Sequence, residues 1–301
     1  MYLCMQIINN MGFWKAFFGG ETDPEEEKKN AEDKKFDMLK YDGVKAIRYG
    51  QNELAAKFFN EALKYKNDPE VHDYLSNVYI RMGMLDEALQ ETKIVVQAEP
   101  DNINLLLKAA SVAYMKEDYA EMTDFCKQAL ELDGDHALVH LIYAKAELGQ
   151  QNLIQGIARL TKALALDDEL AEGHQLRGQT LMLMGDLDAA TADAEWLEQN
   201  QSTDPDAMLL VARLEAAKGH QQEAVDKYVK VIDLNPFHLD AYRERGKIRF
   251  DLGDKQGAEE DMQKVLELNP NEMADVNGEY SAEGIEQKTR QAYSNLNPFG
   301  I

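Results

Sequence analysis

Cysteine is rare in this 301-residue chain, and basic residues are outnumbered by acidic ones. The two cysteines, Cys4 and Cys126, belong to no paired or clustered set, which argues against a disulfide framework and a cysteine metal site. Cys126 falls on the apolar face of an expected helix, so we predict that it is a small buried hydrophobe. Such cysteine usage suits a reducing, cytoplasmic compartment. With 32 Lys and Arg against 55 Asp and Glu, the net charge is −23, which disfavours attraction to nucleic acid.

Patterns that carry chemistry are also missing. No stretch has a clear strand pattern, and no glycine-rich loop follows one to hold a phosphate. His136 and His140 are spaced as a metal-binding face would require, but His140 takes a core-facing helix position and His136 lies in the preceding loop. No serine–histidine–aspartate or cysteine–histidine set can be assembled. We therefore predict a protein that is not an enzyme, with no catalytic residue, no metal and no cofactor.

A long uninterrupted apolar run is absent too. Residues 1–20 are rich in aromatic and apolar side chains, but Asn9, Asn10 and Lys15 interrupt them, which argues against a membrane-spanning helix. Neither a basic start nor a small-residue cleavage site of a signal peptide is evident, and Met11 is a second candidate start. Two interpretations stay open for this segment. Its aromatics pack on the exposed end of the fold, or they form a weak interfacial membrane anchor.

What the chain does contain is a helical hairpin, clearest at residues 239–272. Two stretches with helical apolar spacing flank Gly253, whose conformational freedom suits a chain reversal between helices. Pro270 follows the second stretch and ends it. Gly246 and Ala258 fall where the two helices would cross, so the backbones can approach closely. One hairpin cannot bury its apolar face alone, and copies are therefore expected.

The copies recur with a fixed period. Steps of 34 residues back from Gly246, with a last step of 33, meet only small residues: Ala212, Gly178, Ala144, Ala110, Ser76 and Gly43. The same steps from Gly253 meet the expected turn residues: Gly219, Gly185, Gln151, Glu117, Gly83 and Gly50. Glycine is missing at Gln151 and Glu117, which leaves the local turn geometry open there but not the fold. Gly149 stands two positions early, so we expect the turn of the fourth hairpin to be the least regular.

In these features the chain resembles the tetratricopeptide repeat (TPR) family, whose unit has 34 residues with small residues and proline at set places. The resemblance implies an all-α superhelical solenoid of seven helix-turn-helix repeats. The repeats assigned are 36–68, 69–102, 103–136, 137–170, 171–204, 205–238 and 239–272. Residues 1–35 would form the aromatic segment and a charged linker, either mobile or a frayed helix. Residues 273–301 would form a capping helix and a tail.

The resemblance further implies that the first helix of each repeat, helix A, lines a concave groove. Polar groove residues would then include the following: Asn77, Lys108, Lys145, Gln179, Arg213, Arg243 and Lys247. Cations inside an acidic body would attract an acidic group of a partner. Alternatively, they only offset neighbouring carboxylates such as Glu172, Asp240 and Glu244. Both interpretations stay open at this point.

The function that this pattern favours is a non-catalytic scaffold for protein–protein interaction. It would bind an extended peptide or a helix of a partner protein, with acidic groups as one recognition feature. Three alternatives remain: a membrane-associated assembly or regulatory factor tethered by its N-terminal aromatic segment, an enzyme or small-ligand protein with a groove pocket, and self-association. The family's clamp for acidic chaperone tails is not predicted, because Val44 stands where the clamp needs asparagine.

Overall fold

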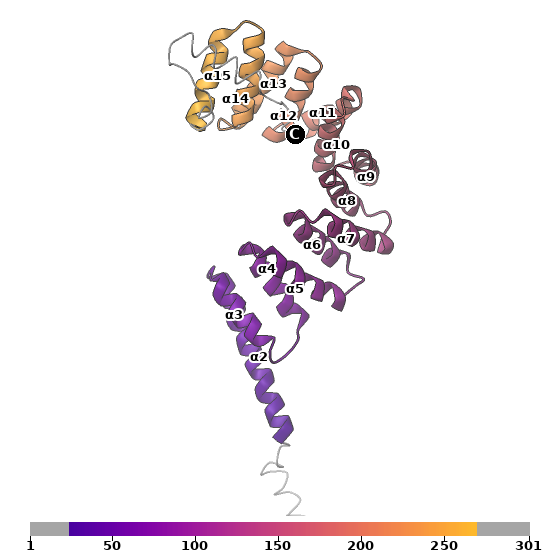
Figure 1. Cartoon of the computed structure of the whole chain (residues 1–301), viewed down its shortest axis with the longest axis vertical. Coiled ribbons are helices and arrows are strands. Elements are labelled where there is room, and N and C mark those ends of the chain that lie inside the picture. Colours follow the sequence, from indigo (N-terminus) through magenta and orange to yellow (C-terminus); the bar gives the residue numbers. More distant parts are fainter. Residues whose placement is uncertain (1–23, 270–301) are drawn as a thin grey trace, which may run out of the picture. The chain divides into compact units, whose positions relative to one another are not determined.

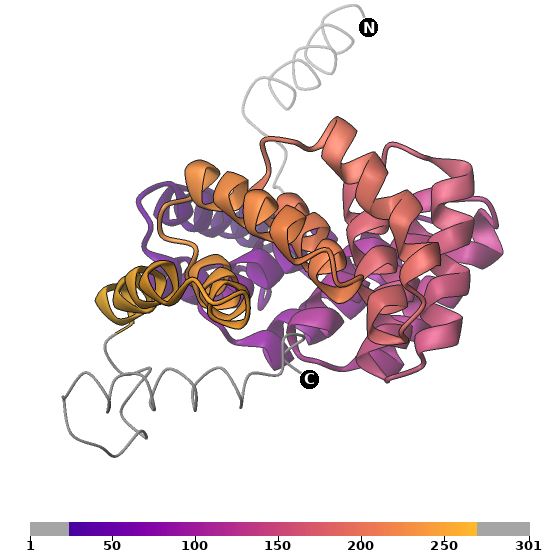
Figure 2. The same cartoon turned by 90° about the horizontal axis from the view of Figure 1, so that it is seen from above.

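The computed structural model describes residues 24–269, and every helix or strand in this range is an α-helix (Figure 1). The N-terminal segment 1–20 and the expected capping helix lie outside the described residues. The fourteen helices form seven consecutive pairs, as the repeat pattern predicted. Figures 1 and 2 show such a pair, α14 and α15, lying side by side.

The chain divides into two compact bodies, with the boundary after Leu132. The helices of the N-terminal body are α2 (Pro24–Arg48), α3 (Asn52–Ala62), α4 (Pro69–Arg81), α5 (Leu85–Ala98), α6 (Ile103–Met115) and α7 (Tyr119–Leu132). Those of the C-terminal body are α8 (Ala137–Gly149), α9 (Leu153–Leu166), α10 (Ala171–Leu183), α11 (Leu187–Asn200), α12 (Pro205–Ala217), α13 (Gln221–Leu234), α14 (Leu239–Asp251) and α15 (Lys255–Leu268). Even-numbered helices are the A helices of hairpins one to seven.

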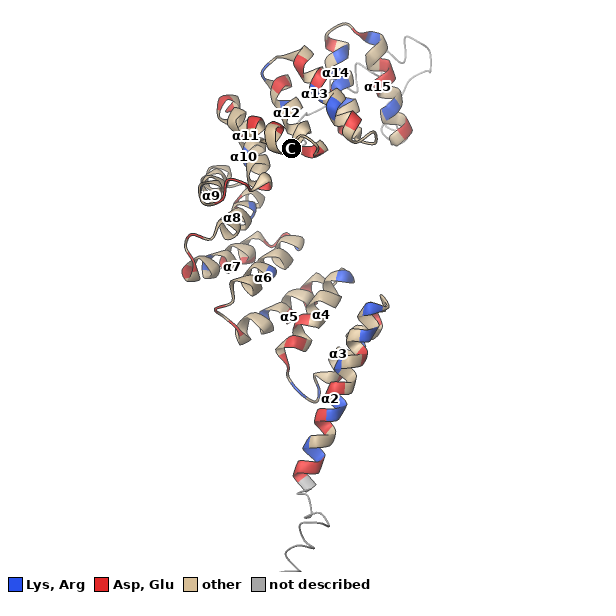
Figure 3. Ribbon diagram, turned by 180° about the vertical axis from the view of Figure 1, so that it is seen from behind, with Lys and Arg blue, Asp and Glu red and all other residues tan. Residues whose placement is uncertain are grey.

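Helix α2 starts well before the first repeat. It begins at Pro24, so the described part of the charged linker is helical and continuous with helix A of hairpin one. Its first turn holds three glutamates, and its last turn holds Lys45 and Arg48. This distribution of charge is favourable for the helix dipole. Figure 3 shows both signs of charge densely distributed over this helix, whereas α8 and α9 carry few charges.

The hairpins are held together by close contact at the small residues. A Cβ atom on Gly43 would lie 2.5 Å from the ring of Phe59, which is fully buried. At Gly178 the nearest atoms would lie 3.3 Å away, on Asp193 and Leu210. Cys126 is fully buried on α7, as predicted. These contacts explain why the repeat keeps small residues at the helix crossing.

All seven turns between paired helices have the same backbone conformation. The five turn glycines have positive φ, and Glu117 and Gln151 adopt the same region with φ of 59° and 62°. The hydrogen bonds match as well: Asp118 N–H donates to Ala113, and Asn152 N–H donates to Glu147, as Met84 N–H does to Tyr79. The expectation that the fourth hairpin has the least regular turn was therefore wrong, because a non-glycine residue is held there in the left-handed region by the surrounding structure.

Candidate partner-binding pocket

A pocket of about 550 Å³ opens in the C-terminal body. It lies among α8, the start of α9, α10, α12 and the start of α14, so four A helices contribute. Its apolar lining is Leu148, Leu153, Leu176, Met182, Leu183, Leu209 and Leu210. Its polar lining is Gln175, Gln179, Thr180, Asp206, Arg213, His238 and Asp240. This size and this mixture suit one or a few side chains of a bound partner.

The helical period explains why these residues meet. Gln175 and Gln179 are one helical turn apart on α10, as are Leu209 and Arg213 on α12, so each pair lies on one helix face. Leu209 and Leu210 line the pocket and are nearly fully buried, so they are called its floor, whereas Leu183 is 39% exposed and is called its wall. The pocket therefore combines a fixed apolar floor with an accessible wall.

Arg213 is the fixed cation of the pocket. Its Nε donates to both carboxylate oxygens of Glu244, at 3.1 and 2.9 Å, and its Nη2 donates to Oε1 at 2.6 Å. The hydroxyl of the buried Tyr228 donates to the same carboxylate at 2.8 Å. Burial alone would lower the pKa of Arg213, but the hydrogen bonds and charge of Glu244 raise that pKa. Burial, together with Glu244, raises the pKa of Tyr228 well above its ordinary value.

The carboxylate of Asp206 is placed differently. It is 70% exposed at the pocket rim, and its ionic neighbour is His238, whose Nε2 lies 3.4 Å from Oδ1. The backbone N–H of Ala241 donates to Nδ1 of His238 at 3.3 Å, where this histidine caps α14. Since Nδ1 accepts, a neutral His238 carries its proton on Nε2. Asp206 therefore has no permanently charged cation beside it in the described part of the chain.

The structure brings two of the seven predicted groove residues, Gln179 and Arg213, into this pocket. Lys145 pairs with Glu172 at 2.6 Å, and Arg243 pairs with Asp240 at 2.9 Å. Lys247 is half-buried on α14 and forms no ion pair with a described residue.

The remaining two predicted groove residues belong to the N-terminal body. Lys108 and Asn77 both donate to Asp73, at 2.6 and 3.3 Å. Several of the predicted cations are thus paired with neighbouring carboxylates, among them Glu172, Asp240 and Glu244, which the alternative interpretation named.

Sequence reasoning missed the acidic side of the pocket. Asp206 and Asp240 occupy the second place of their repeats, where the resemblance implies groove exposure. From the sequence, Asp240 is expected only as a counter-charge of the groove cations, and Asp206 is not expected at the site. The repeated acid at this place was the available signal.

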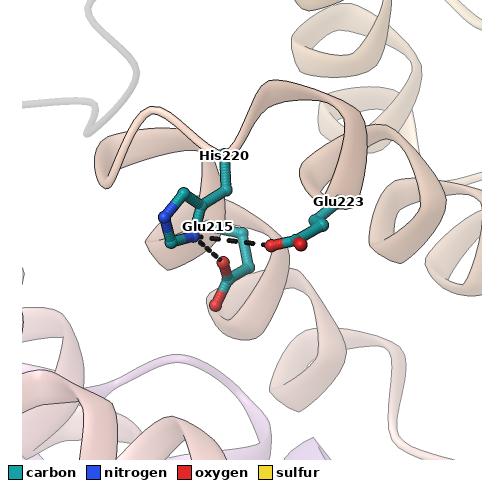
Figure 4. Close-up of side chains that lie close together, drawn as sticks. All are labelled: Glu215, His220 and Glu223. Carbon is teal, nitrogen blue, oxygen red and sulfur yellow. Dashed lines mark hydrogen bonds and ion pairs between the residues drawn. The ribbon is translucent and has the colours of Figure 1, made fainter.

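A separate polar cluster lies at the exposed turn between α12 and α13. Nδ1 of His220 lies 2.7 Å from a Glu215 oxygen and 3.5 Å from a Glu223 oxygen (Figure 4). These three side chains are close enough to hold a metal ion together. The cluster also has a simpler explanation, because His220 stands at the N-cap of α13 and Glu223 lies in its first turn, where a negative charge is favourable.

The fourteen helices of residues 24–269, arranged as successive packed hairpins, define an all-α repeat fold. The Tetratricopeptide repeat family model matches residues 239–272, the hairpin in which the pattern was clearest. The chain is a tetratricopeptide repeat protein.

Solved structures share this fold. A tetratricopeptide repeat protein from Parabacteroides merdae superposes with a TM-score of 0.65 at 17% identity, covering 87% of this chain and 100% of the other. PilW, a type IV pilus biogenesis factor, gives 0.60 at 20% identity, covering 73% and 97%. YrrB gives 0.52 at 18% identity, covering 60% and 94%.

The curated relatives are longer proteins. The DnaJ protein P58IPK homolog B of Oryza sativa subsp. japonica is 23% identical over 78% of this chain, which corresponds to 43% of that protein. Tetratricopeptide repeat protein 21B of Xenopus laevis is 29% identical over 29% of this chain and 7% of its own length. The chain thus spans less than half the length of these relatives. Among helices α2–α15, none has the length and hydropathy that crossing a bilayer requires.

Proposed function

We propose that this protein is a non-catalytic scaffold that binds an extended segment or a helix of a partner protein at the pocket of the C-terminal body. The single observation that carries the proposal is the pocket itself, to which A helices of four successive hairpins contribute side chains. The tetratricopeptide fold supports an interaction role in general, and YrrB is described as having an unusual peptide-binding site.

The chemistry of the pocket supports binding over catalysis. Apolar side chains form its floor, and its side-chain amides, Gln175 and Gln179, can pair with the backbone of a bound segment. Arg213 already has Glu244 as a counter-charge. The pocket therefore offers a surface for an apolar side chain, with hydrogen-bonding groups around it.

The test uses two leucines of similar exposure. Leu183, 39% exposed, lines the pocket, whereas Leu166, 37% exposed on α9, does not. Peptides would first be selected on the full chain from a phage-displayed library of random sequences, and their affinities then measured by fluorescence anisotropy.

Leu183→Glu should lower the affinity for these peptides by more than about tenfold, because it would place a carboxylate in the apolar wall. Leu166→Glu should leave them unchanged. Equal binding by both variants, with helicity intact, would contradict the proposed site.

A further inference from the structure

The C-terminal body repeats one ion pair between neighbouring A helices, and the pair is incomplete at the pocket. Lys145, at the ninth place of hairpin four, pairs with Glu172 at the second place of hairpin five, at 2.6 Å. Arg213, at the ninth place of hairpin six, lies 3.5 Å from Asp240 at the second place of hairpin seven. Both pairs have the same spacing in sequence and join consecutive A helices.

The intervening pair has its acid but no cation. Hairpin six supplies Asp206 at its second place, but the ninth place of hairpin five is Gln179. Gln179 is exposed and forms no hydrogen bond with a described residue. Within residues 24–269, the ionic neighbour of Asp206 is His238 alone. Both side chains line the pocket, beside its apolar floor.

The second acid of the pocket differs, because it is already compensated. Asp240 lies between two guanidinium groups, with Arg243 Nη1 at 2.9 Å and Arg213 Nη2 at 3.5 Å. The unmatched charge at this rim is therefore negative and lies at Asp206. The net charge of −23 on the whole chain also favours the approach of cationic segments.

We propose that the partner supplies the missing cation: a lysine or arginine side chain binds Asp206, and an adjacent large apolar side chain enters the pocket. Gln179 is then available to the backbone of that segment. This inference rests on the proposed function and specifies its ligand, a basic and apolar segment in place of the acidic partner expected from the groove cations. The charge of Arg213 is already compensated by Glu244, to which its Nε and Nη2 donate, so it attracts an acidic group less than an unpaired arginine would.

The test restores the cation within the chain. Gln179→Arg should place a guanidinium opposite Asp206, as Arg213 lies opposite Asp240, and so compete with the partner's cation. Asp206→Asn removes the carboxylate. Gln221→Arg, an exposed position at the start of α13 outside the pocket, makes the same change of charge and serves as the control.

The probes are the peptides selected from the random phage library, each with a copy in which lysine and arginine are replaced by glutamine. Selected peptides should be rich in basic residues next to apolar ones, and the replacement should weaken binding about five- to tenfold. Gln179→Arg and Asp206→Asn should each weaken the original peptides similarly. On either variant the replacement should have little further effect, and Gln221→Arg should not weaken binding.

Two outcomes separate the inference from the function on which it rests. In the first outcome, Leu183→Glu abolishes binding, but the selected peptides are acidic or bind Gln179→Arg more tightly. This would contradict a basic ligand and leave the pocket as the binding site. Peptides that are insensitive to Leu183→Glu would overturn the proposed site itself.

Discussion

Arg245 and Asp261 form a buried two-point ion pair inside hairpin seven. Nε of Arg245 donates to Oδ2 at 3.0 Å and Nη2 to Oδ1 at 2.5 Å, and Asp261 is 2% exposed. Hairpin five repeats the arrangement at the same places, with Arg177 bonded to both oxygens of Asp193 at 2.9 and 2.7 Å. Charged groups thus take core positions between paired helices, where each depends on its partner.

Removal of one partner of this pair should lower the free energy of unfolding more than replacement of both partners by apolar residues. Asp261→Asn leaves the guanidinium of Arg245 buried without its counter-charge and should lower the free energy of unfolding by about 3–5 kcal/mol. Replacement of both residues by apolar ones, Arg245→Met with Asp261→Leu, should cost much less. Arg249 also donates to Asp261, and after the double replacement it would still have Asp254 as an ionic neighbour, 3.8 Å away. Urea unfolding followed by circular dichroism measures the free energy of unfolding of the single and the double variant. Equal losses in the two variants would contradict the claim that each charge depends on its partner.

The helix crossing in hairpin one should not tolerate a methyl group. Gly43→Ala would bring Cβ within 2.5 Å of the buried Phe59 ring and should lower the free energy of unfolding by about 1–3 kcal/mol. Gly178→Ala is the matched variant, because its nearest contacts would be 3.3 Å, and the helix propensity of alanine offsets them. Thermal unfolding of the two variants should differ clearly. A neutral Gly43→Ala would show that Phe59 has room to move.

The two non-glycine turns offer a gain in stability. Glu117→Gly and Gln151→Gly should each raise the free energy of unfolding by about 0.5–1 kcal/mol, because both residues adopt a positive φ that glycine takes more readily. Gly185→Ala, at φ of 79°, is the reverse change and should destabilise the chain. Denaturant midpoints compare the three variants. A loss on Glu117→Gly would mean that the side chain, and not the backbone, sets the turn.

His140 should make stability fall on mild acidification. Burial lowers its pKa below the ordinary 6.5, and the charges of Arg159 and Lys162 add to this, although its bond to Gly134 opposes it. Below pH 6.5 the unfolded chain then binds a proton that the folded chain does not, so stability decreases as pH falls from 6.5 towards the folded pKa.

The check compares the unfolding free energy of the wild type and His140→Leu between about pH 5 and pH 7. The variant should lose less stability over this range, because leucine does not titrate. Parallel slopes for the two proteins would show that His140 is not responsible.

The sequence predicted the fold because the packing positions are local and periodic. Gly43, Gly178 and their counterparts mark one helix crossing per repeat, and a fixed period needs no tertiary information. The turn residues were predicted less well, since Glu117 and Gln151 have unfavourable propensity for a conformation that tertiary contacts impose.

The site was only partly predictable. The repeat position placed Gln179 and Arg213 on the pocket face, but it could not reveal which cations would find partners. Arg213 is neutralised by Glu244 from the next A helix, whereas Asp206 lacks the cation that its neighbours at the same place have. Such pairings depend on the distance between helices, which composition and spacing do not fix.

Hydrogen–deuterium exchange of the full chain, with and without a peptide selected from the random library, tests the central claim most directly. The account predicts slower exchange in α10 and α12, around Gln179 and Arg213, with no change in the B helices α11 and α13. Loss of that protection in Leu183→Glu would agree with the pocket as the binding site. Protection confined to α11 and α13, or unaffected by Leu183→Glu, would contradict it.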